Sequence, residues 1–201
     1  MKTRIVIVTA LAFLMTANVF AQNNSGGISF GARAGINFQN LTGKYSNGDK
    51  YSNKLIPGFN IGANVEIPVA TDFYIQPGLL FTTKGAKWKS NNVKTTLSYL
   101  EIPINFLYKP ALGDGKLLLG FGPYVAFGVG ANNVDFGSNV NQFKRFDAGA
   151  NLLAGYELSS RLSFQLNAGL GLVNLANRAE GDTKSSIKNT GFGLSVGYRF
   201  K

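Results

Sequence analysis

Two residue types are missing from this chain of 201 residues, which contains no cysteine and no histidine. Without cysteine there is no disulfide framework, so the fold has to be stabilised by a packed core or by closure of a sheet. Without histidine the chain lacks the general base on which lipid hydrolases and acyltransferases of membrane barrels commonly depend. Enzymes of those two kinds therefore lack a required residue here.

Long hydrophobic runs are also missing beyond Ala21, where we find no stretch of 18 apolar residues and no convincing 3.6-residue period. We therefore expect a nearly all-β chain without a helical membrane span. The one apolar run, residues 5–19, follows Lys2 and Arg4, and Val19 and Ala21 stand at the −3 and −1 positions of a small-residue cleavage site. This pattern predicts a signal peptide over residues 1–21 and one mature domain over residues 22–201. The alternative, a membrane-anchoring helix, is disfavoured because a span needs about 20 residues.

Acidic residues are scarce, since 20 lysines and arginines face 10 aspartates and glutamates, for a formal charge of +10. Loss of Lys2 and Arg4 with the signal peptide leaves a charge of +8. Strong basicity favours either nucleic acid or an anionic membrane surface as a partner. Export makes nucleic acid the poorer choice, so we expect no nucleic-acid partner.

The mature sequence is rich in alternating apolar and polar residues, the period-two pattern of β-strands. The longest example is a hairpin over residues 73–108, whose polar tip contains Asn91 and Asn92. If its turn centres near Asn92, Lys84 lies opposite Glu101 or one step of two residues away. Each arm of the hairpin is one strand, and six further strands are predicted at residues 28–38, 57–67, 117–129, 146–158, 162–172 and 190–200.

The connections between these strands alternate in length. Long loops are expected at residues 39–54, 131–145 and 174–189 and at the hairpin tip, and short turns at 68–72, 111–115 and 159–161. An even number of strands of about ten residues, with long loops at one end and short turns at the other, is typical of outer-membrane barrels. The sequence therefore predicts an all-β fold, an eight-stranded antiparallel up-and-down transmembrane β-barrel, located in the bacterial outer membrane.

The two faces of the strands differ in polarity, because one carries almost only Phe, Leu, Ile, Val and Ala. A soluble eight-stranded barrel, the structural alternative, would have to bury the charged face in a dry core at a high desolvation cost. We therefore expect lipid on the apolar face, and a lumen just wide enough for side chains on the other. The lumenal charge network is predicted to contain Arg33, Glu66, Lys84, Glu101, Asp147, Glu157 and Arg199.

The strand phase also sorts the aromatic residues into two girdles, as expected at the two membrane interfaces. The periplasmic girdle is predicted from Phe30, Phe73, Tyr108, Tyr156, Phe164, Tyr198 and Phe200, and the outer one from Phe38, Phe59, Phe81, Phe127, Phe146 and Phe192. Three prolines fall inside predicted strands, where proline normally marks an edge or a bulge. Because a closed barrel has no edge, we expect bulges at Pro77, Pro103 and Pro123.

Catalysis by paired carboxylates is the enzymatic alternative, since Glu101 and Asp147 both fall in the outer half of the lumen. A glycosidase-like pair needs one carboxyl group that keeps its proton, whereas Lys84 and Arg33 nearby favour the ionised form of both. We interpret the four residues as a salt-bridge network, with a second layer of Glu66, Glu157 and Arg199 towards the periplasm. We therefore expect no catalytic residue, no metal site and no cofactor.

Two segments of the hairpin resemble the paired signatures of the PorT-like outer-membrane β-barrel family. They are residues 74–85, which read YIQPGLLFTTKG, and residues 99–104, which read YLEIPI. Later segments at residues 122–124, 146–157 and 197–200 are similar to further signatures of that family. The resemblance implies a small outer-membrane barrel, with prolines where these prolines stand. One member of the family is linked to a secretion machinery, so the resemblance also implies a secretion-complex partner as one option.

The predicted external loops carry +7 of the mature charge of +8. Because lysine and arginine bind phosphate well, we expect these loops to bind lipopolysaccharide, while ordinary solvated loops are the alternative. The expected function is a non-catalytic outer-membrane barrel with a structural, adhesion or assembly role, and a narrow channel for small solutes or ions is the rival. Expected partners are membrane lipid, the barrel assembly machinery during insertion, and a secretion or surface protein. The candidate lipopolysaccharide-binding residues are Lys87, Lys89, Lys94, Lys144 and Arg145.

Overall fold

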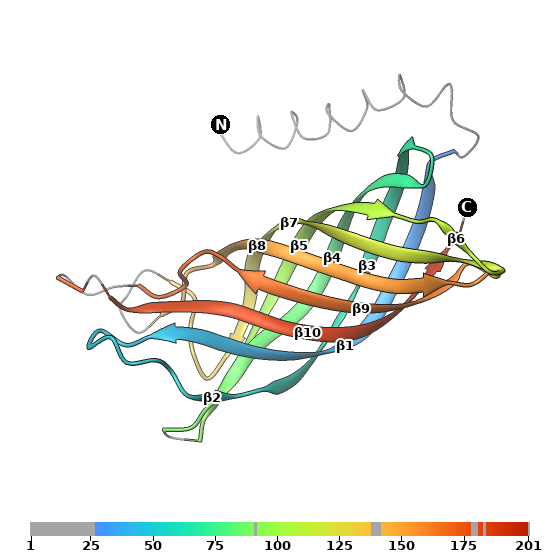
Figure 1. Ribbon diagram of the computed structural model, residues 1–201. Helices are drawn as coiled ribbons and strands as arrows, with labels where there is room; N and C mark the ends of the chain where they lie inside the picture. The colour runs from blue at the N-terminus through green and yellow to red at the C-terminus, as the bar shows by residue number, and fades with distance from the viewer. Residues whose placement is uncertain (1–26, 91, 138–141, 178–180, 183, 201) are drawn as a thin grey trace.

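The computed structural model describes residues 27–90, 92–137, 142–177, 181–182 and 184–200. Over these residues all regular elements are β-strands, and the strands form one barrel (Figure 1). The predicted signal peptide, residues 1–21, lies outside the described residues. The eight long strands are β1 Ser29–Lys44, β3 Ile56–Ala70, β4 Phe73–Trp88, β5 Lys94–Tyr108, β7 Gly115–Asn132, β8 Phe146–Glu157, β9 Leu162–Gly171 and β10 Ser186–Arg199, and the two short ones are β2 Asn53–Lys54 and β6 Ala111–Leu112.

The barrel closes because β1, the first strand, pairs with both β3 and β10, the last. The other long strands pair with their neighbours in sequence, and all pairs are antiparallel. β2 pairs with the far end of β4, and β6 forms a small hairpin with β7. The predicted eight-stranded antiparallel up-and-down barrel is therefore confirmed.

Alternation along each strand separates a buried inner face from an exposed outer face, and β5 shows this most regularly. Its inward side chains Leu97 and Tyr99 are fully buried, whereas Leu100 and Ile102 on the outer face are more than two-fifths exposed. Every other long strand also carries at least two exposed large apolar side chains. An apolar surface this extensive is expected to contact another apolar phase, which for a closed barrel is the hydrocarbon of a bilayer.

No helix among the described residues has the length and apolar character that a membrane span requires.

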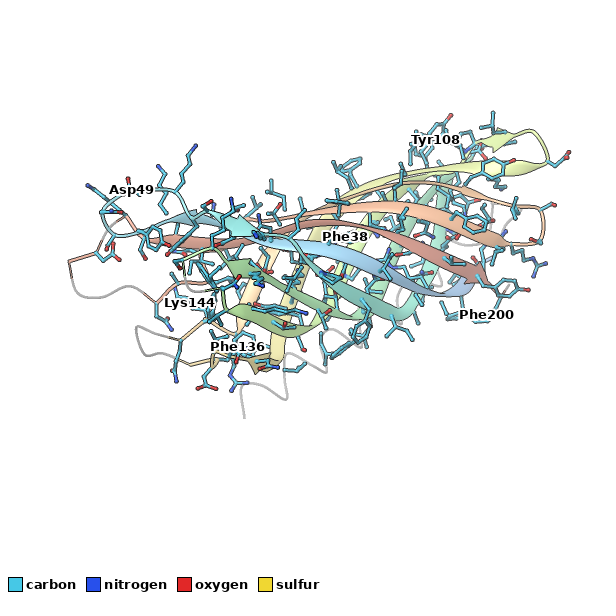
Figure 2. All side chains as sticks on the ribbon, turned by 90° about the horizontal axis from the view of Figure 1, so that it is seen from below. Phe38, Asp49, Tyr108, Phe136, Lys144 and Phe200 are labelled. Atoms are coloured by element: carbon cyan, nitrogen blue, oxygen red, sulfur yellow. The ribbon has the colours of Figure 1, made fainter. Side chains whose placement is uncertain are left out.

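The two ends of the barrel differ. Short turns and the C-terminus lie at one end, whereas β1 and β10 project beyond the other end together with the long connections (Figure 1). Figure 2 places Tyr108 and Phe200 at the short-turn end, and Asp49, Phe136 and Lys144 at the opposite end. By the convention of outer-membrane barrels, long connections are extracellular and short turns periplasmic.

Two predicted loops turn out to be partly strand. The expected loop over residues 39–54 is wrong for its first part, because β1 continues to Lys44, and the expected loop over residues 174–189 is wrong for its last part, because β10 begins at Ser186. The two extensions pair with each other, for example Thr42 with Lys188. Outside the membrane neither face of a strand needs to be apolar, so the alternation that reveals a strand fades there.

The predicted register of the long hairpin is also wrong. Lys84 lies opposite Leu97, and Glu101 lies opposite Leu80. The strands pair as far as Lys87 with Lys94, so the turn centres about two residues before the position assumed from Asn92. Asn92 does have a positive φ of 62°, so it is a turn residue without being the turn's centre.

The three bulges predicted at Pro77, Pro103 and Pro123 are wrong as well. Pairing lapses briefly beside Pro77 and Pro103 and resumes in the same register, and Pro123 pairs in register with Ala150. A local gap in the hydrogen-bond ladder is enough to accommodate the missing N–H group. The register shifts of the barrel occur elsewhere, between Pro68 and Ala70 and between Ser98 and Tyr99.

The aromatic residues expected to form girdles meet in pairs across neighbouring strands. Towards the periplasm, Phe73 stacks on Tyr108 with ring centroids 4.8 Å apart, and Tyr156 pairs with Phe164. Pairs predicted for the outer girdle are Phe38–Phe192 and Phe59–Phe81, at 5.5 and 5.7 Å, and Phe127–Phe146 in register.

Candidate functional site

A lysine lies between two carboxylates in the outer half of the lumen. The Lys84 ammonium group is 2.8 Å from a carboxylate oxygen of Glu101 and 3.3 Å from one of Asp147. The same Asp147 oxygen accepts hydrogen bonds from the Tyr124 hydroxyl group at 3.1 Å and the Asn189 amide at 2.8 Å. Lys84 also lies 4.1 Å from the centroid of the Tyr124 ring, a cation–π distance. We call Lys84, Glu101, Asp147, Tyr124 and Asn189 the outer cluster.

This arrangement departs from the predicted strand register but still brings Lys84 and Glu101 together. The two residues come from β4 and β5 and are offset by four positions along the hairpin. The long lysine side chain spans the offset because both side chains point into the same narrow lumen. Asp147 arrives from β8, on the far side of the ring, and its side chain is completely buried. The outer cluster therefore links strands from opposite walls.

A second lysine lies between two carboxylates nearer the periplasm. The Lys109 ammonium group is 2.7 Å from Glu66 and 2.9 Å from Glu157. Glu157 also accepts two hydrogen bonds from the Arg199 guanidinium group, at 2.6 and 3.1 Å. The Gln76 amide donates to Glu66 at 3.1 Å. We call Lys109, Glu66, Glu157, Arg199 and Gln76 the inner cluster.

Sequence analysis missed Lys109, although its side chain is only 2% exposed and holds the inner cluster together. A signal for it was available. The odd-numbered residues of β5, such as Leu97 and Glu101, point inward, and the same phase extended two residues beyond Leu107 reaches Lys109. The predicted strand ended at Tyr108, so the last inward position was left out.

Arg33 stands apart from both clusters. Its guanidinium group donates one hydrogen bond, 3.3 Å long, to Asn167, and among the described residues no carboxylate lies within ion-pair distance of it. Arg33 lines a cavity of about 70 Å³ that also borders Lys84, Glu101 and Tyr124. A polar cavity of this size has room for a few water molecules. The outer cluster contains one lysine and two carboxylates, so its net charge is negative. Arg33 balances that charge across the cavity and not by direct contact.

The outer mouth of the barrel is closed by apolar side chains from two long connections. Phe143 lies between β7 and β8 and Leu175 between β9 and β10, and both pack on the inward residues Leu97 and Tyr99. Backbone hydrogen bonds tie the connections together, since Lys144 N–H donates to Leu175 C=O at 2.9 Å. We call this cluster the plug; its members are Leu41, Ala86, Leu97, Tyr99, Tyr124, Ala126, Phe143, Leu175, Ala176 and Ile187, with Tyr51, Trp88, Val134 and Phe136 against it.

The Phe136 ring lies directly over Gly128, where a Cβ atom would collide with the ring. It also makes an edge contact with Tyr99, with centroids 5.7 Å apart. Glycine at this strand position therefore creates the space into which the loop aromatic folds. This connection was predicted only as a long loop, and its isolated apolar residues Val134, Phe136 and Phe143 were the signal that it packs.

The five basic residues predicted to bind lipopolysaccharide come from two connections at the outer end of the barrel. Lys87, Lys89 and Lys94 lie at the end of the β4–β5 hairpin. Lys144 and Arg145 belong to the connection that contributes to the plug. The Arg145 guanidinium group lies 5.8 Å from the Phe136 ring and donates to Gly128 C=O at 3.4 Å, so it already has protein partners.

Comparison with solved structures found similar chains at low sequence identity. The structure resembles Ail, the attachment invasion locus protein of Yersinia pestis, solved in complex with the heparin analogue sucrose octasulfate; the TM-score is 0.47 at 16% identity, over 87% of this chain and all of that one. It also resembles an outer membrane channel from Pseudomonas putida F1, with a TM-score of 0.35 at 12% identity over 90% and 98% of the two chains. The NanC porin gives 0.31 at 10% identity, over 87% and 100%.

No curated protein matches the sequence. A family model does match, over residues 20–177, and its description is "Outer membrane protein beta-barrel domain". The match covers most of the strands that form the barrel and both charged clusters except Asn189 and Arg199. The narrower PorT-like assignment stays a resemblance. The chain belongs to the family of outer membrane proteins with this β-barrel domain.

Proposed function

We propose that this protein is a closed, non-catalytic barrel that acts at the outer-membrane surface, where its basic external loops bind lipopolysaccharide. The observation that carries the proposal is the filling of the lumen at three successive levels. The plug blocks the outer mouth, the outer cluster ties opposite walls together below it, and the inner cluster does the same near the periplasm. What remains to interact with partners is the external surface.

A channel would have to cross all three levels. A solute entering from outside would displace Phe143 and Leu175 and then separate the buried Lys84 from two buried carboxylates. Breaking a buried ion pair leaves an uncompensated charge, which is strongly unfavourable. We therefore expect the purified protein to give no conductance steps in a planar lipid bilayer. Reproducible ohmic steps at low voltage would replace this proposal with the rival one, a narrow channel for small solutes or ions.

The lumenal carboxylates are also poorly placed for catalysis. Glu101 and Asp147 share one lysine, and the neighbouring cavity of about 70 Å³ is too small for a sugar ring or an acyl chain. A glycosidase-like mechanism needs both carboxylates to reach the same substrate bond. The arrangement fits a structural ion-pair network, so the proposed role is non-catalytic.

Binding of lipopolysaccharide is proposed because the external loops are basic and lysine is an effective phosphate ligand. Replacement of Lys87, Lys89 and Lys94 by glutamine should lower the amount of lipopolysaccharide that stays with the protein through purification in mild detergent. Variant and wild type should show the same heat-modified mobility on gels, the sign of a folded barrel. Unchanged retention by a folded variant would remove these loops from the proposal.

A protein partner is the remaining part of the proposed function, supported only by the resemblance to the PorT-like family. Purification from the native outer membrane in mild detergent tests it. A partner recovered in stoichiometric amount would point to an assembly or secretion complex. Recovery of lipopolysaccharide alone would favour a barrel that acts by itself.

A further inference from the structure

Three lysines lie side by side on neighbouring strands at the outer end of the barrel. In the antiparallel pairs, Lys54 of β2 faces Lys87 of β4, and Lys87 faces Lys94 of β5. Neighbouring strands are about 4.8 Å apart, so three facing residues extend over roughly 10 Å. Lys54 and Lys94 are exposed to solvent and Lys87 is partly exposed. We call Lys54, Lys87 and Lys94 the lysine row.

The lysine row has no counter-charge within ion-pair distance among the described residues. None of the ion pairs that these residues form includes a member of the row. Like charges that face each other across paired strands are destabilising. The rest of the hairpin fixes the register that places these lysines opposite one another. An external anion bound at the row would therefore reduce the electrostatic repulsion among them.

The position of the row along the strands selects which anion can reach it. On the outer face of β4, the apolar surface ends at Phe81, and Thr83 and Gly85 separate it from Lys87; on β5, Leu100 is separated from Lys94 by Ser98 and Thr96. Six residues of strand measure about 20 Å, which at a tilt of about 45° is roughly 14 Å of height. The lysine row therefore stands well above the hydrocarbon boundary, in the layer of surface sugars and not at the level of the lipid headgroups.

We propose that the lysine row binds phosphate groups carried by the core sugars of lipopolysaccharide. This inference rests on the proposed function and sharpens it, because it adds Lys54 and leaves out Lys89, Lys144 and Arg145. Lys89 lies beyond the end of β4, and Lys144 and Arg145 lie on the connection between β7 and β8. Three ammonium groups in a line of roughly 10 Å can engage two neighbouring phosphates at once, as point charges without a fixed orientation. A lipid-anchored phosphate at the membrane interface lies too low for the row.

The test compares two variants that lose the same charge. The row variant is Lys54→Gln, Lys87→Gln and Lys94→Gln, and the matched control is Lys44→Gln, Lys50→Gln and Lys184→Gln, three exposed lysines elsewhere on the outer end. Delipidated protein in detergent is titrated with lipopolysaccharide that has a phosphorylated core, with the same material after removal of the core phosphates, and with free lipid A. Heat-modified gel mobility verifies that both variants fold.

We expect the row variant to bind the phosphorylated form about a hundredfold more weakly than wild type, or about fivefold per lysine, and the control to lose much less. Wild type should prefer the phosphorylated core to both other ligands. Equal losses in the two variants, or equal binding of lipid A and the phosphorylated form, would overturn the lysine row while leaving surface binding of lipopolysaccharide intact. Wild type that binds none of the three ligands would overturn the proposed function itself.

Discussion

The two lumenal clusters have the same central element and different surroundings. In each, one lysine lies between two carboxylates, Lys84 in the outer cluster and Lys109 in the inner one. Each lysine lies near an aromatic ring, but the outer lysine also lies below the plug, and its counter-charge Arg33 is out of contact. The inner lysine has a second cation close by, because Arg199, about a quarter exposed, binds Glu157 directly. Loss of the central lysine should therefore lower the free energy of unfolding more in the outer cluster than in the inner one.

The largest effect is expected from Lys84→Met, which removes the charge and keeps most of the apolar stem. Glu101 and Asp147 then remain buried together without a cation in contact. Loss of one partner of a buried ion pair costs about 3–5 kcal/mol, so the variant should fold with a free energy of unfolding lower by about that amount. Reversible denaturant unfolding in lipid vesicles measures it, with fluorescence of Trp88, the single tryptophan of the chain, as the probe.

The triple change Lys84→Met, Glu101→Gln and Asp147→Asn is the control for that prediction. It removes all three charges and leaves polar groups of nearly unchanged size. If unpaired charge is the cause of the loss, the triple variant should be more stable than Lys84→Met alone. A triple variant that is less stable than the single one would mean that packing around Lys84, and not charge, dominates.

A smaller loss, about 2 kcal/mol, is expected from Lys109→Met. Glu157 keeps its two hydrogen bonds to Arg199, so only Glu66 loses its cation, and hydrogen bonds to charged groups are worth about 1.5–3 kcal/mol. The same unfolding experiment measures the change. Arg199→Gln should lower the free energy of unfolding more in the Lys109→Met variant than in the wild type. The reason is that Lys109 and Arg199 both stabilise the Glu157 carboxylate. Strict additivity of the two changes would contradict the inner cluster as one unit.

The sequence predicts local features of the structure well and contacts between residues distant in the sequence poorly. Period-two alternation assigns the faces of the strands, so the inward positions of Glu101 and Asp147 could be read locally. The partners of Lys84 depend on hairpin register, and an error of two residues in the turn moved the expected opposite residue by four. Lys109 was missed because it follows Tyr108, the last residue of the strand, and the inward phase was not extended beyond the strand. The plug could not be derived, because Phe143 and Leu175 meet through two loops that no periodic pattern describes.

Truncation of a plug side chain should bring the stability cost of removing the central lysine of the outer cluster closer to the cost in the inner cluster. Phe143→Ala opens the outer mouth and lets water reach Lys84 and Asp147. Loss of a core phenylalanine typically costs about 3–5 kcal/mol; a loop that can relax should lose less, about 1–2 kcal/mol. In this background Lys84→Met should cost less than in the wild type, because water solvates the exposed carboxylates. An unchanged cost of Lys84→Met would show that the plug does not keep the outer cluster dry.

The smallest effect is expected from Arg33→Gln, at under about 1 kcal/mol, because this guanidinium group has one hydrogen bond and no carboxylate in contact. We expect Arg33 to compensate the charge of the outer cluster across the cavity. The stability loss caused by Arg33→Gln should therefore disappear when Glu101→Gln is present as well, since the outer cluster is then neutral without Arg33. A double-mutant cycle in the vesicle unfolding assay measures this coupling. If Arg33→Gln costs the same in both backgrounds, Arg33 acts through its hydrogen bond to Asn167 and not through charge.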